Sequence, residues 1–122
     1  MGKLILLADD NEHARIAAQR VLEIAGYQVL AAKDGAEALE LAVIHQPALG
    51  VFDMTMPKLH GHEVCAELRK RDDELARLPI IMLTGVDELM GGALAESAGA
   101  QKYLGKPVNP RELLDAVAVT IA

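Results

Sequence analysis

Residues 4–12 read LILLADDNE, in which five mostly aliphatic residues run directly into two adjacent carboxylates, Asp9 and Asp10. A short, continuous apolar run is typical of a strand that is buried on both faces of a parallel sheet. Two neighbouring carboxylates repel each other unless a positive charge lies between them. The stretch therefore predicts a buried strand that ends at a site in need of a cation.

Further short apolar runs recur along the chain, and each is followed by a longer stretch with helical spacing. These runs cover residues 29–32, 49–52, 79–83 and, more weakly, 103–104. The alternation predicts an α/β fold, an open and doubly wound parallel sheet of five strands with helices on both faces. Nothing in the composition along the chain suggests a linker, so we expect residues 1–122 to form a single domain.

The expected helices cover residues 12–25, 36–45, a stretch after Gly61, 87–98 and a final stretch from Pro110. The last helix has a clear start, because Asn109 is a good cap and proline suits the first helical position. Its apolar side chains are expected to face the sheet; they are Leu113, Leu114, Val117, Ala118 and Ile121.

Composition excludes several classes of function. The formal net charge is -6, with 12 Lys and Arg against 18 Asp and Glu, which argues against direct nucleic-acid binding. The single cysteine, Cys65, allows no intramolecular disulfide, and the apolar runs are far shorter than the roughly 20 residues that span a bilayer. We expect a cytoplasmic protein with no membrane contact.

Polar residues follow four of the five predicted strands. They are Asp9 and Asp10, then Asp53, then Thr84, which precedes Gly85, and finally Lys106, which precedes Pro107. In doubly wound sheets the ligand site lies outside the carboxyl ends of the strands, so we expect these groups to gather at one edge. Three converging carboxylates favour a hard divalent cation such as Mg²⁺, and an ionised aspartate held there can attack phosphorus without a general base.

At this point the chain resembles the receiver domain of two-component response regulators over essentially all 122 residues. The resemblance rests on the acidic pair Asp9-Asp10, on the segment DMTMP at residues 53–57, and on Thr84 and the Lys106-Pro107 pair. The spacings also match: 43 residues from Asp10 to Asp53, 31 more to Thr84 and 22 more to Lys106. The family implies a flavodoxin-like sheet with strand order 2-1-3-4-5.

The resemblance implies a role for each site residue. Asp53 would accept a phosphoryl group from the phosphohistidine of a sensor histidine kinase or phosphotransfer protein, or from a small acyl phosphate. Mg²⁺ or Mn²⁺ would be held by Asp9, Asp10, Asp53 and the Thr55 carbonyl. The phosphoryl oxygens would be bound by Lys106, Thr84 and the amides of Thr55 and Gly85.

The resemblance also implies a mechanism of output. Tyr103 would turn inward when Thr84 is drawn toward the phosphoryl group. This would change the face made by the fourth helix, the fifth strand and the fifth helix, which would bind a downstream protein target or form a phosphorylation-dependent homodimer. The side chains of Thr55 and Val86 are poor at orienting water, so we expect slow self-dephosphorylation, over minutes or longer.

Two other functions compete with this one. A Mg²⁺-dependent phosphohydrolase with an aspartyl-phosphate intermediate would carry a second aspartate two residues after the nucleophile, where this chain has Thr55. A binding module that has lost phosphorylation would lack some of the five site residues, and none is missing.

Overall fold

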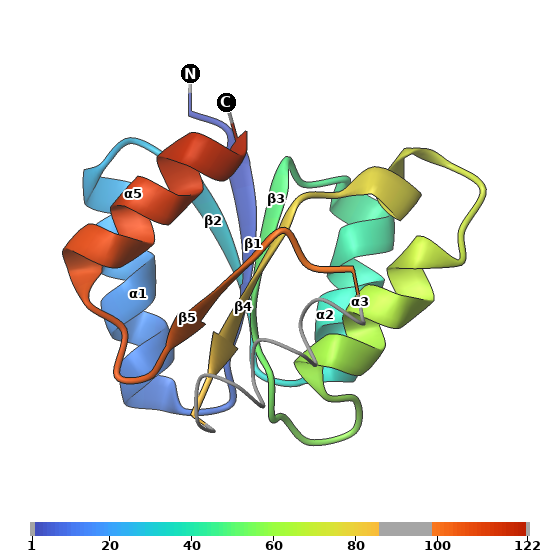
Figure 1. Cartoon of the computed structure of the whole chain (residues 1–122), viewed down its shortest axis with the longest axis horizontal. Coiled ribbons are helices and arrows are strands. Elements are labelled where there is room, and N and C mark those ends of the chain that lie inside the picture. The colour runs from blue at the N-terminus through green and yellow to red at the C-terminus, as the bar shows by residue number, and fades with distance from the viewer. Residues whose placement is uncertain (1, 86–98, 122) are drawn as a thin grey trace.

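The protein folds around one five-stranded parallel sheet with the strand order β2-β1-β3-β4-β5, as seen in a computed structural model that describes residues 2–85 and 99–121 (Figure 1). The strands are β1 (Leu4–Ala8), β2 (Gln28–Ala32), β3 (Leu49–Asp53), β4 (Ile80–Thr84) and β5 (Lys102–Gly105). The predicted fold class and strand order are confirmed.

Helices pack on both faces of this sheet (Figure 1). On one side lie α1 (Glu12–Ile24) and α5 (Pro110–Ile121), and on the other α2 (Gly35–His45) and α3 (Gly61–Arg69), followed by the short 3-10 helix η1 (Glu74–Arg77). The helix expected over residues 87–98 lies outside the described residues.

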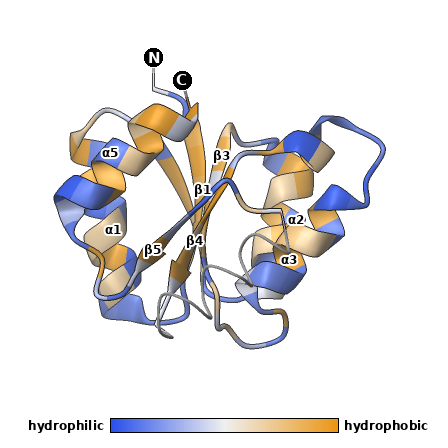
Figure 2. Ribbon diagram, viewed as in Figure 1, coloured by the Kyte–Doolittle hydropathy of each residue, from blue (hydrophilic) through white to orange (hydrophobic). Residues whose placement is uncertain are grey.

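Two apolar clusters fill the space between the sheet and the helices. Because side chains alternate along a strand, Ile5 and Leu7 of β1 face the α1 and α5 side, whereas Leu6 and Ala8 face the α2 and α3 side. All residues of β3 and β4 are buried. The hydropathy colouring agrees with this, with mostly apolar residues in the central strands and polar residues mainly in the helices and loops (Figure 2).

Side-chain caps begin α1, α2 and α5, and the cap of α5 is the one predicted from the sequence. The Oδ1 atom of Asn11 accepts from the Ala14 amide at 2.9 Å, and Asp34 does the same for Glu37 at 2.8 Å. Asn109 accepts from the Arg111 amide at 2.8 Å at the start of α5. These caps satisfy amides that have no partner within their own helix.

The prediction for the buried face of α5 is wrong at one position. Ala118 is exposed, whereas Ala116 is buried beside Leu113 and Val117. A helix turns by about 100° per residue, so positions 113, 116 and 117 share one face and position 118 lies off it.

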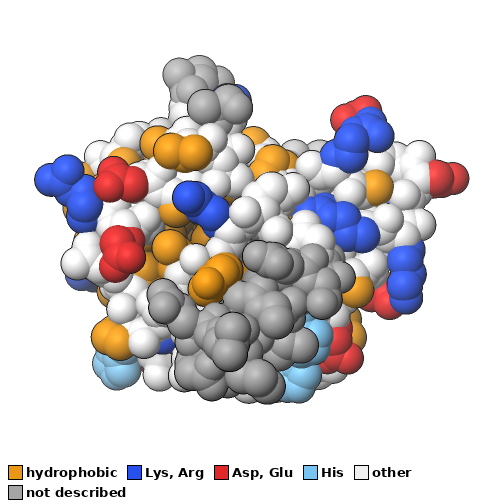
Figure 3. All heavy atoms as spheres, in the orientation of Figure 1, with side chains coloured by type: hydrophobic (Ala, Val, Ile, Leu, Met, Phe, Trp, Pro, Cys, Tyr) orange, Lys and Arg blue, Asp and Glu red, His pale blue; other side chains and the backbone are white. Residues whose placement is uncertain are grey.

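Charged side chains of both signs are interspersed on the surface (Figure 3). On the face shown in Figure 3, apolar side chains also reach the surface over β5 and α5. Within residues 2–85 and 99–121, no helix combines the length and apolar character needed to cross a bilayer.

Candidate functional site

The strand register brings the predicted residues to one edge of the sheet. Asp53 is the last residue of β3 and pairs with Leu83, so that Thr84 ends β4 one position further on. Thr84 pairs in turn with Gly105, which places Lys106 directly after β5. Asp9 follows β1 at the same edge, since Ala8 pairs with Phe52.

Three carboxylates gather at this edge as predicted. Asp9, Asp10 and Asp53 each offer an oxygen, and these oxygens lie within 4.8 Å of one another. Asp9 and Asp53 are buried, with 2% and 4% of their surface exposed, whereas Asp10 is exposed. This is a hard oxygen donor set, open on one side, and it fits a divalent cation such as Mg²⁺.

Lys106 supplies a positive charge to the cluster. Its Nζ atom lies 2.8 Å from Oδ2 of Asp53 and 3.5 Å from Oδ2 of Asp9. One lysine among three aspartates gives the cluster a formal net charge of -2. The excess negative charge is what a bound divalent cation would neutralise.

The pKa values of the central pair are shifted by burial and by each other. Burial raises the pKa of the Asp53 carboxyl, and the charge of Asp9 adds to this, while Lys106 and the Thr55 amide act in the opposite direction. Burial alone would lower the pKa of the Lys106 ammonium. The hydrogen bonds that Lys106 makes to Asp53 and Asp9, together with the negative charges of these two residues, outweigh burial, so the pKa is raised. Lys106 therefore stays charged at neutral pH.

The remaining predicted residues surround this centre. Oδ1 of Asp53 accepts from the Thr55 amide at 3.3 Å, and the Thr84 carbonyl accepts from the Lys106 amide at 2.8 Å. Only 1% of Thr84 is exposed. Gly85 is exposed just beyond β4, and Tyr103 is partly buried against the core on the α2 and α3 side.

The loop from β3 to α3 is held tightly beneath Asp53. The Gly61 amide donates to the Met54 carbonyl at 3.0 Å, and a Cβ atom on Gly61 would collide with the Asp53 carbonyl. His60 also contributes, because its Nδ1 atom accepts from the Met56 amide at 3.3 Å. The loop thus fixes the backbone on both sides of Thr55.

One residue near the site was not predicted from the sequence. Nη1 of Arg15, on α1, donates to the backbone carbonyl of Asp9 at 3.0 Å. The available signal was a basic residue in the second turn of a helix that begins immediately after the acidic pair. Such a side chain can reach back to the end of the strand, but many surface arginines share that position.

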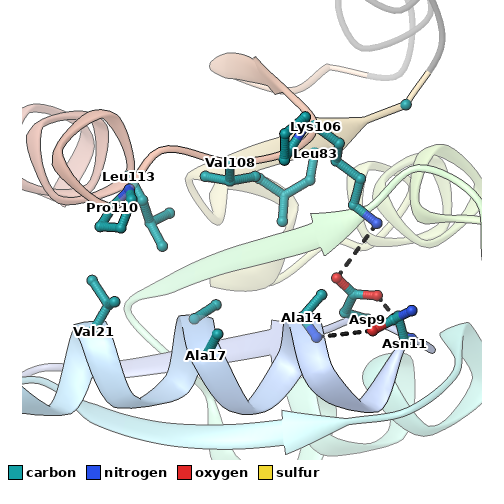
Figure 4. A pocket seen from close by; sticks show the side chains of 13 residues that line it. Asp9, Asn11, Ala14, Ala17, Val21, Leu83, Lys106, Val108, Pro110 and Leu113 are labelled. Atoms are coloured by element: carbon teal, nitrogen blue, oxygen red, sulfur yellow. Dashed lines mark hydrogen bonds and ion pairs between the residues drawn. The ribbon is translucent and has the colours of Figure 1, made fainter.

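A cavity of about 590 Å³ opens beside the site, between α1 and the segment from β5 to α5 (Figure 4). Asp9, Asn11 and Lys106 stand at one end, and the rest of the wall is apolar, with small alanines on α1. Ala17 of α1 borders this cavity and is exposed.

Comparison with known proteins agrees with the fold. The family model of the response regulator receiver domain matches residues 5–118, and the chain belongs to this family. The alkaline phosphatase synthesis transcriptional regulatory protein PhoP of Bacillus subtilis is 43% identical over 113 residues, which are 93% of this chain and 46% of PhoP. The chain thus spans about half the length of that curated relative.

Solved structures show the same fold. The chemotaxis protein CheY4 of Vibrio cholerae superposes with a TM-score of 0.90 at 30% identity, over 98% of this chain and 99% of that one. The receiver domain of the sensor histidine kinase PA1611 of Pseudomonas aeruginosa gives a TM-score of 0.90 at 29% identity, over 99% and 98% of the two chains. That structure is described with a magnesium ion coordinated in its active-site cleft.

Proposed function

We propose that Asp53 is the phosphoacceptor of this receiver domain and that its phosphorylation switches the surface that partners bind. One observation carries the proposal: a buried carboxylate at the end of β3 is paired with Lys106 at 2.8 Å inside a cluster of three acidic groups. Such a cluster costs free energy unless it binds something positive. A phosphoryl group with its counterion is a ligand that uses every group present.

In the proposed reaction an Asp53 oxygen attacks phosphorus in line with the leaving group. The new bond joins oxygen to phosphorus, and the bond from phosphorus to the donor breaks. A phosphohistidine donor then leaves as the imidazole, and a small acyl phosphate leaves as the carboxylate. Lys106 and the Thr84 hydroxyl would bind phosphoryl oxygens, assisted by the amides of Thr55 and Gly85.

Asp9, Asp10, Asp53 and the Thr55 carbonyl would hold Mg²⁺ or Mn²⁺. The oxygens of the three carboxylates lie close enough to share one ion, and they are the ligand type these ions prefer. When bound, the ion would neutralise charge on the phosphoryl oxygens. The magnesium described in the PA1611 receiver domain supports this assignment.

The proposed partners follow from the chemistry. A sensor histidine kinase or phosphotransfer protein would supply the phosphoryl group, and the output would be a downstream protein target or a phosphorylation-dependent homodimer. Tyr103, partly buried on β5, would turn inward when Thr84, at the end of the neighbouring strand β4, moves toward the phosphoryl group. We also propose that residues 1–122 act as one receiver domain in the cytoplasm.

The test uses acetyl phosphate as the donor, because it needs no partner protein. Incubated with Mg²⁺, the protein should gain one phosphoryl group by intact mass spectrometry, and with EDTA in place of Mg²⁺ it should gain none. Labelling that is equal under both conditions would contradict the proposed cation requirement. Continuous release of phosphate without a labelled protein would favour the phosphohydrolase instead.

A further inference from the structure

We propose that Arg15 is a positioning residue that sets the orientation of the cation-binding aspartates. Its Nη1 atom donates to the Asp9 carbonyl at 3.0 Å, across the turn that joins β1 to α1. This carbonyl belongs to the peptide bond between Asp9 and Asp10. The inference rests on the proposed cation site but concerns a residue outside it.

The other groups of this turn are held by separate bonds. The Asp9 amide donates to the Ala32 carbonyl at 3.1 Å, and Oδ1 of Asp9 accepts from the Asn11 amide at 2.9 Å. Neither bond fixes the plane of the peptide that follows Asp9. Within the part of the chain that the structure describes, the Arg15 guanidinium is the group that donates to that carbonyl.

The orientation of this peptide matters most for Asp10. Asp10 is exposed and lies in a bend, so packing does little to restrict its side chain. Its carboxylate must nevertheless converge with the buried carboxylates of Asp9 and Asp53. Loss of a bond that orients a direct ligand typically weakens cation affinity by roughly ten- to a hundredfold.

Positioning and charge predict opposite results when Arg15 is replaced. A guanidinium near the acidic cluster repels a divalent cation, so removing its charge alone would tighten cation binding. Loss of the bond to Asp9 would instead let the peptide between Asp9 and Asp10 rotate and would weaken cation binding. The direction of the change therefore separates the two roles.

The experiment measures Mg²⁺ binding without any phosphoryl donor, from amide chemical shifts during a Mg²⁺ titration. Arg15→Met keeps the apolar stem and removes both the charge and the donor, and we expect Mg²⁺ binding to weaken roughly tenfold. Arg15→Lys keeps the charge and one possible donor and should recover part of the affinity. Arg20→Met removes an exposed arginine from the same helix and should bind at least as tightly as the wild type.

Unchanged or tighter binding by Arg15→Met, with the Asp9 and Asp10 amides shifting as in the wild type, would overturn the proposal. Thermal unfolding without Mg²⁺ checks the fold, and if Arg15→Met fails to fold, the Mg²⁺ affinity of Arg15→Lys relative to wild type decides instead. Labelling by acetyl phosphate at saturating Mg²⁺ should persist in a folded Arg15 variant. If the wild type is not labelled by acetyl phosphate, the proposal that Asp53 is the phosphoacceptor is wrong. The Mg²⁺ titration still decides the role of Arg15 in that case.

Discussion

The Nζ atom of Lys106 lies 2.8 Å from Oδ2 of Asp53, so one ion pair joins the residue after β5 to the last residue of β3. The two residues are 53 positions apart in the chain. The pair connects the strand that ends at the acidic cluster to the strand that carries Tyr103. A ligand that changes this pair therefore acts on both strands.

Replacing Lys106 by methionine should destabilise the protein when no divalent cation is present. Asp53 and Asp9 would then lose a charged partner while remaining buried, at a cost of about 1–3 kcal/mol in the free energy of unfolding. Because Mg²⁺ can neutralise the same carboxylates, the difference from wild type should shrink in Mg²⁺. Urea denaturation with and without Mg²⁺ measures this difference. A cost that is the same in both conditions would contradict the idea that Lys106 and Mg²⁺ neutralise the same carboxylates.

Gly61→Ala should be among the most damaging small substitutions. The added Cβ would collide with the Asp53 carbonyl and with Sδ of Met82, and the loop beneath the acidic cluster would have to move. We expect a loss of about 2 kcal/mol or more in unfolding free energy.

Gly105→Ala is the matched control for this substitution, because among the described residues no atom beyond its two chain neighbours lies within 4 Å of the Cβ position there. It should unfold close to the wild type in the same thermal or urea experiment. Equal stability of the two variants would mean that the loop below Asp53 is not tightly packed.

The charge of Asp34 should contribute stability that depends on pH. The bond from the Glu37 amide, together with Lys58, lowers the pKa of the Asp34 carboxyl below its usual 3.8. The folded state therefore releases this proton more readily than the unfolded state, so the contribution is present above pH 3.8 and is lost as pH falls through the lowered pKa.

Asp34→Asn isolates this effect, because asparagine can still cap α2 but carries no charge. We expect it to be less stable than wild type at neutral pH, with a difference that narrows as the pH falls below 3.8. Asp34→Ala, which also loses the cap, should cost about 1 kcal/mol more. Urea denaturation across this pH range measures these differences. A difference in unfolding free energy between wild type and Asp34→Asn that does not change with pH would contradict the proposed contribution of the Asp34 charge.

The acyl phosphate on Asp53 should decay slowly, with a half-life of minutes or longer. Thr55 is exposed next to the acidic cluster, and its side chain has neither a carboxylate nor an amide with which to orient an attacking water. Thr55→Asn should shorten the half-life several-fold, as followed by loss of the mass label after the donor is removed. A wild-type half-life of seconds in Mg²⁺ would refute this prediction.

The sequence was sufficient to predict the sheet and the convergence of the site. Buried parallel strands are continuously apolar, and four of the five predicted strands are followed by a polar residue of the site, so the sequence places Asp9, Asp53, Thr84 and Lys106 at one edge. The cap at Asn109 could be predicted too, because it depends on residues close together in sequence.

Other features depend on contacts between distant elements and could not be predicted. The bond from Arg15 to the Asp9 carbonyl requires the angle between β1 and α1, which no local pattern encodes. The exposure of Ala17 follows from the cavity left between α1 and the β5–α5 segment. The wrong prediction for Ala118 has a simpler cause, because alanine is small enough to occur on either face of a helix.

The most direct test of the central claim compares labelling of the wild type and of Asp53→Asn by acetyl phosphate in Mg²⁺, with intact mass as the readout. Asp34→Asn serves as the control, because it also removes a buried carboxylate but lies outside the acidic cluster. Wild type and Asp34→Asn should each gain one phosphoryl group, and Asp53→Asn should gain none. Equal labelling of all three proteins would show that another residue accepts the phosphoryl group.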